Sequence, residues 1–424
     1  MTKNNQIINN NNIIISPAKK IILGLQHVLA MFGATVLVPF LTGLDPSISI
    51  LCAGIGTLIF HLCTKGKVPV FLGSSFAFIG AIALTLSQHG IGVVKGGIIA
   101  AGLIYVIMSY IIKKFGVNTV HSFFPPIVTG PIVMVIGLRL SPTALQMSGY
   151  FYDTKAQVSE INPKYLLIAG IVVITMILVS IFAKGFFKLV PILISVLVGY
   201  FVSILFGLVE FEPIKEAAWF GFSPIAWEHI KTFPVFNLTG ILAIAPIALV
   251  VFIEHIGDIT TNGAVVGKDF FIDPGIHRTM LGDGLATIVA GFLGGPANTT
   301  YSENTGVLAV TKVYDPSILR IAAIFAIILS FIGKFGAIIR SIPNPVMGGI
   351  SIILFGMIAS VGVRTLIESK LEFSYSRNLI ISSLILVLGI AIQEVPIVEG
   401  ISISGLAIAA LVGVILNKIL PENI

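Results

Sequence analysis

The sequence predicts an all-α integral membrane protein with about fourteen transmembrane spans, arranged as two inverted seven-span repeats. Three observations support this fold class. Of the 424 residues, 56% are hydrophobic and only 10% are charged, a balance that excludes a soluble globular domain. Apolar stretches of about 17 to 25 residues recur along the chain, and each could cross a hydrocarbon core of about 30 Å as a helix. The two halves of the chain also carry matching polar and proline-rich positions at nearly equal spacing.

The ends of the apolar stretches indicate how the chain is oriented. Residues 1–18 are rich in asparagine and lack a small-residue cleavage pattern, so we expect an uncleaved, disordered tail. With the N-terminus inside, most of the 25 Lys and Arg residues fall at cytoplasmic ends, which favours a cytoplasmic N-terminus and C-terminus in the cell membrane. The basic residues form no helix or aromatic patch that would bind nucleic acid.

Two cysteines lie in the second apolar stretch, Cys52 and Cys63. Buried thiols in such a stretch behave as small apolar residues, so neither a disulfide framework nor a metal site is expected. No cofactor is expected beyond a coupling ion.

The inverted repeat is predicted from matched landmarks. The polar pair Gln26-His27 in span 1 resembles Glu254-His255 in span 8, and each pair precedes a proline, Pro69 or Pro296, by 43 or 42 residues. The string PPIVTG at 125–130 likewise resembles PNPVMGG at 343–349. Because seven is an odd number, the second copy enters the membrane from the opposite face.

Two segments within the repeats are unlike lipid-facing helices. They read PVFLGSSFAFIG at Pro69–Gly80 and PANTTYSENTG at Pro296–Gly306. Eight consecutive polar or amphipathic residues, 298–305, lie at membrane depth, where non-helical backbone is tolerated only inside protein or along a wet cavity. We expect a short strand in each segment, paired antiparallel with the other and followed by a half-helix. The substrate site of such a transporter lies between matched broken segments.

Three acids fall inside apolar spans, Glu254, Asp258 and Glu303, where a charge costs roughly 2.5 to 3.5 kcal/mol on insertion scales. Glu254 and Asp258 share one helix face with Thr261, and we expect this face to look into the protein. Helix packing or ion pairing is the alternative role for these acids. Buried carboxyl groups can take up and release protons near neutral pH, as proton coupling requires.

Four further polar residues are candidates for a supporting role. His255 points about 100° away from Glu254 on the helix, which favours a structural hydrogen bond. Gln26 and His27 could either line the cavity or bond between helices. Asp283 in span 9 is expected to bridge helices or to orient a span 8 group.

Phe76 aligns with Glu303 when Pro69 is placed on Pro296, so an aromatic face and a hydrogen-bond acceptor should oppose each other. Taken alone, Phe76 would be read as a packing residue. Together with Tyr301 and free N–H groups at the half-helix starts, the pair suits a flat, neutral molecule with N–H donors and carbonyl acceptors. A pyrimidine or purine base fits this description.

Five strings carry a resemblance to a known family: QHVLAMFGATVLVP at 26–39, GSSFAFIG at 73–80, EHIGD at 254–258, NTTYSENTGV at 298–307 and PNPVMGG at 343–349. The chain resembles the nucleobase:cation symporters of the nucleobase-ascorbate family, and within it the bacterial uracil permeases. The resemblance implies a core domain at 19–118 and 237–336, a gate domain at 119–210 and 337–424, and an extracellular loop at 211–236. It also implies proton symport, with sodium as the other coupling ion to consider, and a homodimer through the gate domain.

The resemblance assigns site residues by position. It implies that the span 8 and span 10 acids bind the base, with the span 1 alanine, the span 3 pair and backbone groups of span 10 completing the site: Glu254, Glu303, Ala34, Ser75, Phe76, Tyr301 and Ser302. Three positions depart from the uracil permease pattern: Asp258 stands where a histidine is expected, Ser302 where a glycine is common, and Phe355 where a tyrosine would face the site from the gate. An aspartate such as Asp258 resembles the residue of purine-type members at this position, whereas the TTY and EN elements favour uracil over xanthine as the substrate.

Other function classes remain to be weighed against a nucleobase symporter. A purine permease, an anion transporter of the same fold and a passive channel are the alternatives. An enzyme or an ATP-driven pump is not expected, because the sequence contains no phosphate loop, zinc helix or nucleophile turn.

Overall fold

A computed structural model of the chain describes residues 16–116, 125–153, 158–398 and 401–421. Residues 1–15 of the expected N-terminal tail lie outside the described residues, and the first helix begins at Pro17. The long helices of the first half are α1 (Pro17–Thr42), α2 (Pro46–Cys63), α3 (Ile79–Phe115), α5 (Pro126–Met147), α6 (Pro163–Phe182) and α7 (Pro191–Leu205). Those of the second half are α11 (Ala248–Val266), α12 (Ile276–Leu293), α14 (Pro316–Ser330), α16 (Asn344–Glu368), α17 (Ser376–Ala391) and α18 (Gly405–Ile419), and the shorter α13 (Ser302–Thr311) lies between α12 and α14 along the chain.

Shorter elements connect these helices. The strands are β1 (Leu72–Ser74), β2 (Tyr150–Asp153), β3 (Val158–Ile161), β4 (Asn298–Thr300), β5 (Glu394–Val398) and β6 (Ile401–Ser404). The short helices and helical turns are η1 (Phe76–Phe78), η2 (Gly185–Leu189), α8 (Glu212–Glu216), α9 (Pro224–Lys231), α10 (Leu238–Ile244), η3 (Ala245–Ile247), η4 (Phe271–Gly275) and α15 (Gly333–Arg340).

The protein is a predominantly helical, multi-pass membrane protein. Seven helical stretches within the described residues are long and apolar enough to cross a bilayer, the longest being Phe76–Phe115. Four shorter apolar helices accompany them, α7, α14, α17 and α18. Proline occupies the first turn of most of these helices, where its missing N–H group costs nothing.

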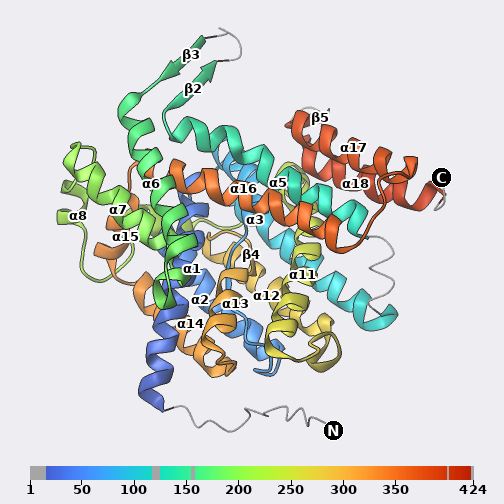
Figure 1. The fold of residues 1–424 in the computed structure, drawn as a ribbon, viewed down its shortest axis with the longest axis horizontal. Coiled ribbons are helices and arrows are strands. Elements are labelled where there is room, and N and C mark those ends of the chain that lie inside the picture. Colours follow the sequence, from blue (N-terminus) through green and yellow to red (C-terminus); the bar gives the residue numbers. More distant parts are fainter. Residues whose placement is uncertain (1–15, 117–124, 154–157, 399–400, 422–424) are drawn as a thin grey trace, which may run out of the picture.

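The helices pack in two groups (Figure 1). In the first group, α3 and α2 pack on α12, and α14 packs on α1 and α2. In the second group, α5 and α16 lie side by side, α6 packs on α16 and α7, and α17 packs on α18 and α5. The two groups meet where α1 contacts α7 and α11 contacts α5.

The segments at 69–80 and 296–306 meet inside the first group. Strand β1 pairs antiparallel with β4, with Gly73 opposite Thr299. Each strand runs into a helix, β1 into η1 and α3, and β4 into α13. Helix α3 is itself divided at Gly90, where a φ of 78° breaks the helical path, a conformation that glycine adopts without strain. The part of α3 before Gly90 is therefore a half-helix, and so is the ten-residue α13.

Candidate substrate-binding site

The paired strands bring two helix N-termini to the same region. Ser75 precedes η1 and Tyr301 precedes α13, and neither side chain caps the helix it precedes. The first N–H groups of a helix have no partner within the helix, and the helix dipole adds partial positive charge there. The two half-helix starts can therefore donate hydrogen bonds to a carbonyl oxygen or an anion.

Tyr301 fixes the strand pair from one side. Its hydroxyl donates to the carbonyl of Ser74 at 3.0 Å, and the hydroxyl of Thr35 on α1 donates to it at 3.4 Å. The Tyr301 ring lies so close to Gly73 that a methyl group on Gly73 would overlap the ring. The strand pair is thus packed against α1 with no space for a side chain at Gly73.

One face of α11 supports the other side of the site. Glu254, Asp258 and Asn262 follow one another at intervals of four residues and so share this face. Asp258 accepts hydrogen bonds from the hydroxyls of Thr300, at 2.6 Å, and Ser302, at 2.5 Å. Two positions at which the sequence departs from the uracil permease pattern, Asp258 and Ser302, are therefore hydrogen-bonded to each other.

Asn262 joins the two interrupted segments. Its side-chain amide donates to the carbonyl of Pro69, ahead of β1, and to the hydroxyl of Thr305 in α13, both at 3.1 Å. The side chain is fully buried. Helix α11 therefore holds both segments at a fixed separation.

Glu303 differs from its neighbours in the segment 300–305, which the structure describes in full. Every other side chain in this segment bonds to a different element of the protein. The pairs are Thr300 and Ser302 with Asp258, Tyr301 with Ser74, Asn304 with His27, and Thr305 with Asn262. Glu303 has no such bond, and its side chain is only partly buried.

Glu254 is in the same situation on α11. Its side chain is partly buried, and no hydrogen-bond donor among the described residues pairs with its carboxyl group. The charges of Glu254, Asp258 and Glu303 are close enough to interact. The two glutamates are thus neighbouring carboxyl groups that are open to a ligand.

His255 and Asp283 form a buried pair behind the site. His255 Nδ1 lies 2.8 Å from Asp283 Oδ2, and His255 Nε2 lies 2.9 Å from the Thr279 hydroxyl. Because that hydroxyl donates to the carbonyl of Ile276, its oxygen accepts from Nε2–H. The pair joins α11 to α12.

The remaining predicted residues lie in different surroundings. His27 is buried and accepts from the Asn304 side chain at both Nδ1, at 3.1 Å, and its backbone carbonyl, at 3.0 Å. Ala34 is fully buried on α1, and Gln26 is partly buried with an unpartnered Oε1. Phe355 is buried in α16 of the second group.

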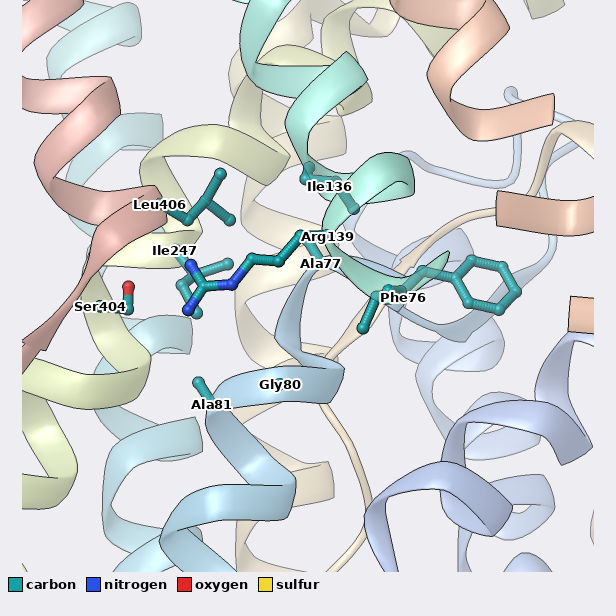
Figure 2. Close-up of a pocket in the computed structure, with 10 residues that line it drawn as sticks. Phe76, Ala77, Gly80, Ala81, Ile136, Arg139, Ile247, Ser404 and Leu406 are labelled. Atoms are coloured by element: carbon teal, nitrogen blue, oxygen red, sulfur yellow. The ribbon is translucent and has the colours of Figure 1, made fainter. Parts of the chain in front are cut away.

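Ser75 and Phe76 lie at the end of β1. Ser75 is buried, its N–H donates to the carbonyl of Ala297 at 2.9 Å, and its hydroxyl has no partner. Phe76 is partly buried and lines a cavity of about 50 Å³ between the two helix groups (Figure 2). Such a volume holds a few water molecules.

Arg139 is a residue of this cavity that the sequence interpretation missed. It projects from α5 toward Ser404 and Ile247, while the Phe76 ring points the other way (Figure 2). Its guanidinium donates to the carbonyl of Gln393 at 2.5 Å. Arg139 could have been singled out from the sequence, because it is a lone charged residue within the apolar stretch 126–147.

Within the ranges that the structure describes, no three His, Cys, Asp or Glu side chains are arranged to hold a metal ion. Cys52 and Cys63 are both free thiols.

Comparison with known proteins decides the family. The model of the Xan_ur_permease family, described as "Permease family", matches residues 18–398. The chain belongs to this family. As a permease it is a membrane transporter and not an enzyme, as the sequence predicted.

Similar proteins cover nearly the whole permease. A uracil permease of Bacillus subtilis (strain 168) is 42% identical over 96% of this chain and 94% of its own length. A uracil permease of Bacillus caldolyticus is 45% identical over 95% of this chain and 92% of its own length. The transmembrane domain of the cyanobacterial bicarbonate transporter BicA superposes with a TM-score of 0.63 at 16% identity, covering 94% of this chain and 96% of that domain. That likeness shows the fold alone.

Proposed function

We propose that this permease imports a nucleobase, uracil in preference to other bases, together with a proton. The observation that carries the proposal is the pair Glu254 and Glu303. They are neighbouring, partly buried residues whose carboxyl groups have no partner on another element, next to two helix starts without side-chain caps. The relatives that cover almost the entire chain are named uracil permeases.

The chemistry of the site suits the edge of a base. Carboxylates accept hydrogen bonds from ring N–H groups, and such charge-assisted bonds are stronger than neutral ones. The N–H groups at the starts of η1 and α13 donate to carbonyl oxygens. Phe76, at the end of β1, offers a flat apolar surface to the ring. In this proposal Ser75, Tyr301, Ser302 and Ala34 shape the site around these contacts.

Alternating access follows from the two helix groups. We assign the first group, which contains the paired strands and all three acids, to the core domain, and the second group to the gate domain. The cavity beside Phe76 lies between them. A rocking motion of the core against the gate would expose the base to each side in turn.

The same proposal includes the topology. With α3 divided at Gly90 and each interrupted segment counted as one crossing, the described elements supply about fourteen spans. We propose that the N-terminus and C-terminus are cytoplasmic, that the protein resides in the cell membrane, and that two copies associate through the gate domain.

The deciding experiment is uptake of radiolabelled uracil into proteoliposomes under imposed pH and sodium gradients, applied separately. Accumulation against the uracil gradient that requires the pH gradient and is abolished by a protonophore is the expected result. Accumulation driven by sodium alone would contradict proton symport. Equilibration without accumulation would indicate a passive channel.

A purine permease is the second candidate, because Asp258 is similar to the acid of purine-type members. Thermal unfolding in detergent with uracil or xanthine separates the two. We expect uracil to raise the unfolding temperature and xanthine to leave it unchanged. Stabilisation by sulfate or chloride, without an effect of uracil, would favour an anion transporter instead.

A further inference from the structure

We propose that Asp258 is a positioning residue, which fixes the start of α13 through Thr300 and Ser302 and so determines how Glu303 meets the substrate. This inference rests on the proposed function, and it deepens the role of the same site. Asp258, Thr300 and Ser302 are called the hydroxyl clamp below.

The clamp uses both oxygens of one carboxyl group. Thr300 donates to Oδ2 at 2.6 Å and Ser302 donates to Oδ1 at 2.5 Å. Short bonds from hydroxyls to a carboxylate are stronger than neutral hydrogen bonds. With both oxygens engaged by the protein, Asp258 is a poor candidate for direct contact with a base, in contrast to Glu254 and Glu303.

The position of the two hydroxyls explains what the clamp controls. Thr300 is the last residue of β4 and Ser302 is the first residue of α13, so the bonds flank the point where strand becomes helix. Tyr301, between them, contributes no side-chain cap to α13. A helix start without a local cap depends on tertiary contacts for its orientation.

Glu303 follows Ser302 directly, in the first turn of α13. Its side chain lacks a partner on another element. Its carboxyl group accepts a hydrogen bond from its own backbone N–H in the same turn, so the carboxyl follows any movement of that turn. A shift at Ser302 is therefore transmitted to Glu303 and to the free N–H groups of the same turn. Loss of either hydroxyl should weaken binding even though neither hydroxyl needs to touch the base.

The test uses Thr300→Val and Ser302→Ala in proteoliposomes. We expect each variant to raise the KM for uracil about tenfold, with the maximal rate retained. Ser302→Thr and Thr300→Ser keep the hydroxyls, so their KM for uracil should match that of the unaltered protein. Thr261→Val is the matched control, because the Thr261 hydroxyl donates to the carbonyl of Gly257 in its own helix.

A double-mutant cycle separates positioning from other effects. In an Asp258→Ala background the clamp is already open, so Ser302→Ala should raise the KM no further. An unchanged KM in folded Ser302→Ala protein, or full additivity with Asp258→Ala, would overturn the inference. If Thr300→Val does not fold in detergent, the Ser302 variants alone test the positioning role of Asp258.

Failure of the inference is distinguishable from failure of the proposed function. If the unaltered protein transports another base instead of uracil, the substrate assignment is wrong, and the cycle is then measured with that base. If uracil is transported normally and the clamp variants keep the KM of the unaltered protein, only the inference is wrong.

Discussion

The acids of this membrane region are distinguished by their partners. Asp283 is paired with His255, and Asp258 is held by two hydroxyls. Glu254 and Glu303 have no comparable partners, and both are partly exposed. An ionisable group at membrane depth is costly, and one without a protein partner is a candidate for binding a ligand. The hydrogen-bond partners of the four acids therefore separate candidate ligand-binding residues from structural ones more clearly than their positions in the sequence do.

We predict that Glu254→Gln and Glu303→Gln each weaken uracil binding about 10- to 100-fold, because each removes a charge-assisted hydrogen bond. The affinity is measured by equilibrium binding of radiolabelled uracil to purified protein. Glu210→Gln, at an exposed position outside the site, is the control and should bind normally. Unchanged affinity in both site variants would rule out these glutamates as base ligands.

The strand pair is the element on which the site is built. Three-residue strands have little stability of their own, so β1 and β4 depend on the side chains that enclose them. Tyr301 bonds to Ser74 and covers Gly73, and Asn262 spans both segments. The region in which we propose the substrate site is thus held by tertiary contacts and not by its own helix or strand propensity.

Gly73→Ala should destabilise the protein by about 1 to 3 kcal/mol, because the added methyl group overlaps the Tyr301 ring and the surroundings must move. Thermal unfolding in detergent measures the change, and uracil binding should fall with it. Gly170→Ala in α6 is the matched control, because a methyl group there meets no neighbouring atom. Equal stability of the two variants would contradict the packing argument.

A second element-scale prediction concerns the start of α14. Asp315 caps this helix through Ser317 and pairs with Lys20 of α1 at 2.6 Å. Partial burial opposes ionisation of Asp315, but the hydrogen bonds from Lys20 and Ser317 outweigh it and hold the Asp315 pKa below its usual value. A carboxyl group with a lowered pKa in the folded state stabilises the fold above its unfolded pKa. That stability is lost as the pH falls through the folded pKa.

We therefore expect the unfolding temperature of the unaltered protein to fall on acidification below the usual carboxyl range. The Asp315→Asn variant should have a lower unfolding temperature than the unaltered protein at neutral pH. Its unfolding temperature should also fall less on acidification. Thermal scans at a series of pH values measure the difference between the two proteins. Parallel curves for both would show that Asp315 does not contribute to acid sensitivity.

At the scale of the whole molecule, the two helix groups meet beside the site. The cavity next to Phe76 takes its walls from both groups, with Ala81 of α3 on one side and Leu140 and Leu406 on the other. Figure 2 shows Ala81 and Leu406 on opposite sides of this cavity. If the groups move against each other during transport, this boundary must change.

Cross-linking tests that motion. Cysteines at Ala81 and Leu406, in a background lacking Cys52 and Cys63, should stop uracil uptake when joined by a short bifunctional thiol reagent. Stabilisation by uracil should persist, because binding requires only one state. A cross-link between Leu140 and Leu406, both in the second group, is the control and should leave uptake intact. Uptake that survives the first cross-link would argue against relative motion of the groups.

The sequence by itself determined that the protein is a membrane transporter of this family. Composition and the length of the apolar stretches report directly on the bilayer, and the polar run 298–305 identified a segment that lipid could not accept. Family membership followed from strings such as NTTYSENTGV and was confirmed by the match over residues 18–398.

Only the tertiary structure decided which acids have partners. Asp258 and Ser302 are 44 residues apart, and helical periodicity describes one face of one helix but not what that face meets. The tertiary structure also revealed Arg139 in the cavity beside Phe76. Partner choice depends on how separate elements pack. A hydrogen bond between two elements is therefore fixed by the fold as a whole and by neither local sequence.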